Sequence, residues 1–178
     1  MTTVIVYLAA FLQSGGVAPE WDVRVQAEKL SKDVGSLRTM VEQLEPDRWL
    51  AAGAPETLAA RRRTALAEFN AVQQAGQALA EQPERFAPAL ELLHHLDSAL
   101  IETHWLIHAV RKYQNPAMAD VIESALEPYE KARTGLKGHV LDLSAVREKE
   151  MEVAEKEAQR CREMLSKPTP RPARPGGE

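Results

Sequence analysis

The chain has 178 residues, which fits one domain or one domain plus an appendage. Apolar residues make up 44% and aromatic residues 5%, so we expect a core built mainly from Leu, Ala and Val. The 22 basic and 26 acidic residues give a net charge of −4, which argues against a nucleic-acid-binding protein. The chain has one cysteine, which excludes a disulfide scaffold and cysteine-rich metal sites.

The first 18 residues form an apolar N-terminal segment with features of a secretory signal peptide. Residues 2–18 carry no charge, residues 4–12 (VIVYLAAFL) are an unbroken apolar run, and Gly16 and Ala18 are small residues where a signal peptidase reads the chain. The run is shorter than the ~20 residues of a spanning helix. We therefore expect a periplasmic or secreted, bacterial-type protein if the segment is cleaved, with a cytoplasmic or membrane-anchored protein as the alternative.

From residue 20 to residue 166 the apolar residues recur at helical spacing, and no stretch alternates as a strand does. Prolines mark where helices begin and end. They divide this domain into predicted helices over 20–44, 55–80, 83–114 and 116–166, with a loop over 47–54 that contains Trp49. Short connections make neighbouring helices antiparallel. The sequence thus predicts an all-α, up-down antiparallel four-helix bundle.

The last predicted helix is longer than the others. Its apolar stripe slips phase after Leu143 and resumes at Met151, which marks a break or a local change in supercoil. Pro128 allows a kink, but we favour one continuous helix of ~75 Å at 1.5 Å per residue, whose end projects from the bundle or folds against a partner. Residues 167–178 (KPTPRPARPGGE) are predicted to be a disordered Pro-rich tail.

Two histidines provide the one candidate metal site. His104 and His108 are four residues apart on the predicted helix over 83–114, so they share a face and could bind one divalent transition metal ion together. The remaining ligands would come from another helix and are not identified by the sequence. The alternative interpretation is two half-buried histidines at the edge of the core. A metal- or haem-binding bundle is therefore the alternative function, and no cofactor is predicted otherwise.

Two further features indicate protein contacts. Trp105 lies away from the main apolar face of its helix, so we expect it to pack against a neighbouring helix, with an exposed interaction surface as the alternative. The end of the last helix carries a short apolar seam at heptad spacing, formed by Met151, Ala154, Ala158, Cys161 and Leu165. This segment is either an exposed, self-supporting helix or a coiled-coil arm. In an oxidising compartment an unpaired Cys161 can link two chains.

Enzymatic chemistry has no positive support in the sequence. The nine glycines are scattered and form no phosphate-binding loop, and no nucleophile–base pair or carboxylate pair can be placed. We therefore expect a non-enzymatic, exported helical bundle. It would act through protein–protein contacts or self-association, using the helix over 83–114 and the C-terminal arm, without nucleic acid and without a membrane span after processing.

Overall fold

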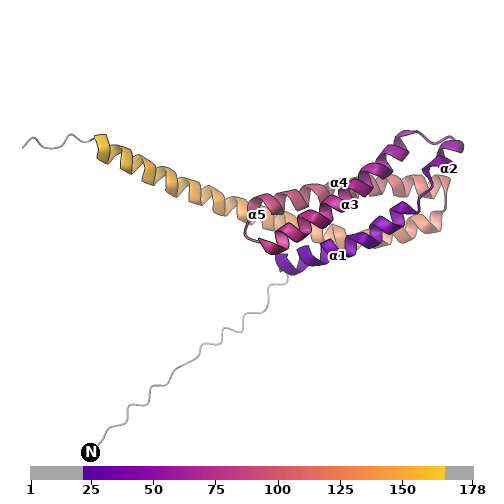
Figure 1. Ribbon diagram of the computed structural model, residues 1–178, viewed down its shortest axis with the longest axis horizontal. Coiled ribbons are helices and arrows are strands. Elements are labelled where there is room, and N and C mark those ends of the chain that lie inside the picture. The colour runs from indigo at the N-terminus through magenta and orange to yellow at the C-terminus, as the bar shows by residue number, and fades with distance from the viewer. Residues whose placement is uncertain (1–21, 167–178) are drawn as a thin grey trace, which may run out of the picture.

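A computed structural model describes residues 22–166, and within them the fold is entirely helical, without strands. The helices are α1 (Val23–Glu42), α2 (Pro46–Ala51), α3 (Thr57–Glu81), α4 (Phe86–Tyr113) and α5 (Pro116–Ser166). Four long helices pack together and α5 continues well beyond them (Figure 1). The predicted four-helix bundle with an extended C-terminal helix is confirmed. The apolar segment 1–18 and the tail 167–178 lie outside the described residues, so both stay predictions.

Side chains and prolines at the helix starts explain where the elements begin. The Asp22 carboxylate accepts hydrogen bonds from the backbone N–H groups of Arg24 and Val25, at 3.0 and 3.2 Å, and so caps α1. Asn115 does the same for α5 through the N–H of Ala117 at 2.9 Å, and Pro116 is its first residue. Helix α5 then runs unbroken to Ser166, as one continuous helix, through Pro128.

The core lies between the four long helices. Helix α3 packs along both α1 and α4, α4 packs along α5, and α1 and α5 are in contact over a shorter length. The predicted seam of α1 is buried at Ala27, Leu30, Val34, Leu37 and Val41. Burying one such Leu or Val side chain contributes roughly 1.5–3 kcal/mol, so these stripes are the main force that holds the helices side by side.

A small residue allows α1 and α3 to approach closely. Gly76 of α3 is buried, and a Cβ added there would lie 3.0 Å from the Ala27 carbonyl oxygen and 3.1 Å from Ser31 Cβ. About four turns closer to the start of α3, Arg62 also faces α1. Its guanidinium donates to the carbonyl oxygens of Val41 and Glu42, at 3.0 and 2.6 Å. It thereby supplies a donor to the end of α1, where Val41 also accepts from the N–H of Leu44.

The short helix α2 overlaps the segment predicted as a loop over 47–54, so that prediction was wrong for residues 47–51. Trp49 is 1% exposed, and its indole Nε1 donates to Gln114 Oε1 at 3.0 Å. One apolar anchor on a single turn gives no repeating pattern, which is why the spacing of apolar residues did not reveal this helix. Helix α2 lies at the end of the bundle opposite the projecting part of α5 (Figure 1).

Candidate interaction surface

The C-terminal part of α5 leaves the bundle. His139 Nε2 lies 2.8 Å from the Pro83 carbonyl oxygen, and Val140 is the last buried residue of α5. Every residue over 145–166 is exposed, and we call this segment the arm. At 1.5 Å per residue the arm is ~33 Å long. Figure 1 shows it extending away from the packed helices, in yellow and light orange.

The arm carries an unusual amount of exposed apolar surface. Its large exposed apolar residues are Val146, Met151, Val153, Met164 and Leu165, and Leu165 is 87% exposed. Exposed apolar residues of this size are typical of protein contact sites. Met151 and Leu165 belong to the predicted seam, whereas Val146, Val153 and Met164 were not predicted from the sequence. Their spacing of 7 and then 11 residues places these three on one side of the helix, about 110° around it from the middle of the seam at 100° per residue.

The predicted seam residues all lie on the arm. Leu136 and Ala154, Val140 and Ala158, and Leu143 and Cys161 are each 18 residues apart in the sequence. Eighteen residues make five full turns at 3.6 residues per turn, so each pair shares one side of α5. Leu136 and Val140 are buried in the bundle, and Leu143 packs against its core. The seam therefore continues the bundle-facing side of α5, and the phase slip is the drift of a straight helix from a heptad repeat.

Charged residues cover the rest of the arm. Arg147 pairs with Glu150 at 2.7 Å and Lys156 with Glu152 at 3.7 Å, all within α5. Exposed pairs of this kind add little stability, typically below ~1 kcal/mol, so they make the arm water-compatible rather than rigid. Cys161 is a free, exposed thiol on the seam.

The outer face of α4 is a second exposed surface. Trp105 is 52% exposed, and the guanidinium of Arg61 from α3 lies 4.7 Å from its ring centroid. Arg61 also donates to the Glu102 carboxylate at 2.9 and 3.1 Å. Ile101, one turn before Trp105, is 54% exposed. A neighbouring helix thus covers one side of the indole, and the other side remains open to a partner.

The two histidines of the predicted metal site have different surroundings in the structure. His104 Nε2 lies 3.0 Å from Glu130 Oε1 of α5, whereas His108 is exposed on the outer side of α4. Within residues 22–166, no group of three or more His, Cys, Asp or Glu side chains is placed to hold a metal ion. The packing of α5 against α4 therefore places the Glu130 carboxylate next to His104. The metal site at His104 and His108 stays a prediction.

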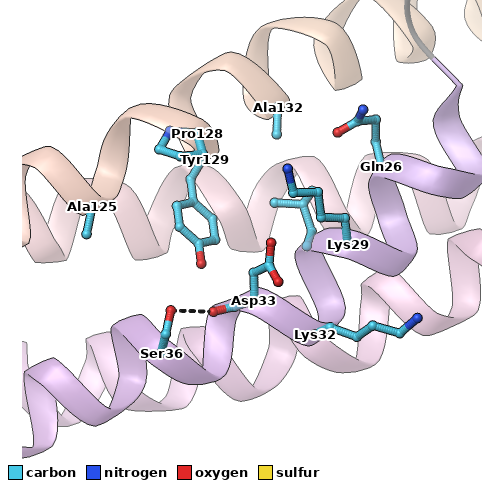
Figure 2. Close-up of a pocket in the computed structure, with 10 residues that line it drawn as sticks. Gln26, Lys29, Lys32, Asp33, Ser36, Ala125, Pro128, Tyr129 and Ala132 are labelled. Atoms are coloured by element: carbon cyan, nitrogen blue, oxygen red, sulfur yellow. Dashed lines mark hydrogen bonds between the residues drawn. The ribbon is translucent and has the colours of Figure 1, made fainter.

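A groove of about 410 Å³ lies where α1 and α5 diverge. Its lining includes Leu30, Ala125, Pro128 and Ala132, and Figure 2 shows the Tyr129 ring pointing from α5 toward α1. Burial raises the pKa of Tyr129, and the nearby negative charge of Asp33 raises it further. The groove thus combines small apolar side chains with a phenol held neutral, and Lys29 and Asp33 stand at its edge (Figure 2).

Comparisons with known proteins add no relative. No protein-family model matches the chain, and neither a curated protein nor a solved structure matches it. Among residues 22–166, none of the helices is long and apolar enough to cross a membrane. We therefore infer the function of this protein from the geometry of the bundle and its arm.

Proposed function

We propose that this protein is a non-enzymatic helical bundle that acts through protein–protein contacts and that the arm is its contact surface. The observation that carries this proposal is the exposed apolar side of residues 145–166, where Met151 and Leu165 meet no other part of the described chain. Helices in proteins gain most of their stability from packing of an apolar face. A partner on the arm would supply that packing. Export to the periplasm or medium is part of the proposal and depends on residues 1–18.

The outer face of α4 supports the same class of function. Trp and Arg are enriched where proteins bind one another, because they combine large contact area with directed polar groups. Trp105 and Arg61 form such a pair on the surface. Fewer large apolar residues are exposed on this face than on the arm, so we assign it a secondary contact.

Site-specific photo-crosslinking in the native cells tests the proposal. A photoreactive amino acid replaces Ala158 on the seam, and in a matched protein it replaces Ala145, which is also an exposed alanine of the arm. Ala145 lies ~140° from Ala158 around the helix at 100° per residue. We expect a protein adduct from position 158 and little from position 145. Equal adducts, or none from either position, would contradict the proposal.

Replacement of the two histidines separates this proposal from the alternative. The variant H104A/H108A should keep the position-158 adduct unchanged, because neither histidine lies on the arm. Zinc titration of the full chain and of this variant by calorimetry measures the metal prediction independently. Zinc binding by the full chain that disappears in H104A/H108A would favour the metal-binding alternative.

A further inference from the structure

We infer that the arm binds the arm of a second copy of this chain and that the two arms run antiparallel. This inference depends on the proposed contact function and names its partner. Three features carry it: the side of α5 on which the seam lies, the order of charges beside the seam, and the sizes of the seam residues.

The position of the seam selects the antiparallel direction. Because Ala158 lies five turns along α5 from buried Val140, the seam faces the side on which the bundle packs. A parallel second helix on this side would continue into the space that α1, α3 and α4 occupy. An antiparallel helix arrives from the free end of the arm, and its own bundle then lies at the far end. The two bundles do not collide.

The charges beside the seam fit the same direction. Glu148, Glu155 and Arg162 are spaced seven residues apart, so they line one flank of a heptad seam. When two arms overlap fully and antiparallel, Arg162 of each copy faces Glu148 of the other, but Glu155 faces Glu155, which repels. When they slide by one heptad, Arg162 of each copy faces Glu155 of the other and that repulsion disappears. A parallel pair in register would set Glu150 against Glu155 of the other copy, which repels, and Glu157 against Arg162, which attracts, so the antiparallel pair shifted by one heptad has the better charge match.

The sizes of the seam residues allow close contact. Ala154 and Ala158 lie at its middle, and the larger Met151 and Leu165 lie toward its ends. Small residues let two helix backbones approach, while the long apolar side chains cover the junction from both ends. The seam spans 151–165, about two heptads with two alanines, and so forms a short interface. The pair should therefore be reversible and depend on concentration.

Sedimentation equilibrium of the full chain under reducing conditions measures the association. Ala158→Glu places a charge on the seam, and Ala145→Glu makes the same substitution outside it. We expect Ala158→Glu to weaken the dimer by at least about tenfold, equivalent to ~1.4 kcal/mol, and Ala145→Glu to change it little. A chain that stays monomeric at the highest soluble concentration, or equal effects of both variants, would overturn the inference.

Spin labels measure the direction. In a Cys161→Ala background, a label on Lys149→Cys sits on the outward side of the arm. Two antiparallel arms separate the labels by about 20–30 Å along the helix axis, since the residue opposite position 149 lies 14 to 21 residues further along the chain. Parallel arms in register give no axial separation. In that case only the width of the two helices, about 20–25 Å, separates the outward-facing labels. A label distance no larger than this width would overturn the antiparallel arrangement.

The crosslinking experiment distinguishes failure of this inference from failure of the proposed function. The inference is supported by an adduct from position 158 that has twice the mass of the chain and in which the crosslinked peptide of the second copy comes from its arm. An adduct only with a different protein overturns the second-copy inference and leaves the contact function standing. Absence of any adduct from position 158 contradicts the contact function as well.

Discussion

Replacing Gly76 by alanine tests how closely α1 and α3 pack. In a helix, Gly to Ala ordinarily stabilises by about 0.8–1 kcal/mol. At position 76 the new methyl group would lie 3.0 Å from a backbone oxygen of α1 and 3.1 Å from Ser31 Cβ. The first of these atoms cannot rotate away, so the two helices would have to separate along part of their contact.

The expected sign follows from comparing these effects. Overpacking in a well-packed interior costs about 1–3 kcal/mol, which exceeds the gain in helix propensity. We expect Gly76→Ala to lower the free energy of unfolding by about 1 kcal/mol, measured by urea denaturation followed by circular dichroism. Gly35 of α1 and Gly138 of α5 have no atom within 4 Å of an added Cβ, so Gly35→Ala and Gly138→Ala serve as matched controls.

The controls should stabilise the protein by up to about 1 kcal/mol each, because only helix propensity changes. The decisive quantity is the difference in sign between Gly76→Ala and Gly35→Ala. If both substitutions raise the urea midpoint by the same amount, α1 and α3 are not in the close contact described above. A change in the slope of the transition would show instead that the denatured state had changed.

Three further substitutions probe the bundle. Arg62→Ala should lower the free energy of unfolding by about 1 kcal/mol, since the carbonyl oxygens of Val41 and Glu42 each lose the hydrogen bond from Arg62, and exposed Arg63→Ala should change it little. Trp49→Phe should cost about 1–2 kcal/mol through loss of the hydrogen bond to Gln114, read as a lower thermal midpoint. The raised pKa of Tyr129 predicts that the contribution of this side chain to stability is fully present below pH ~10 and is lost as pH rises through the higher folded-state value, and Tyr129→Phe should remove this loss. Ultraviolet titration that finds Tyr129 ionising with the unfolded chain's pKa would contradict the last of these.

Long helices could be predicted from the sequence because each one repeats its apolar residue many times. Leu30, Leu37 and Leu44 recur every seven residues, and all three are buried. The position of Trp49 could not be predicted in this way. Its burial depends on Gln114, which is 65 residues further along the chain, and spacing within one segment carries no information about such a partner.

The candidate contact surface was predicted in part. Met151 and Leu165 follow a heptad spacing, so the sequence indicated a seam, but it could not say whether another helix of the same chain covers it. Arg61 and Arg62 show the opposite limit. Arg61 pairs with Glu102 and lies over Trp105, and Arg62 reaches the end of α1, although nothing in the sequence around these arginines indicates either role. Those partners come from other helices and depend on the packing.

The continuity of α5 has a mechanical consequence. One helix forms both a wall of the bundle and the whole of the arm, without a loop between them. A molecule held at the tip is therefore kept at a stand-off of ~33 Å from the packed helices, because a continuous helix transmits bending and torsion along its axis. The length of the arm thus fixes the distance between the bundle and a molecule bound at the tip. Inserting or deleting residues between Leu143 and Met151 in numbers close to whole helical turns would change this distance with little rotation of the tip.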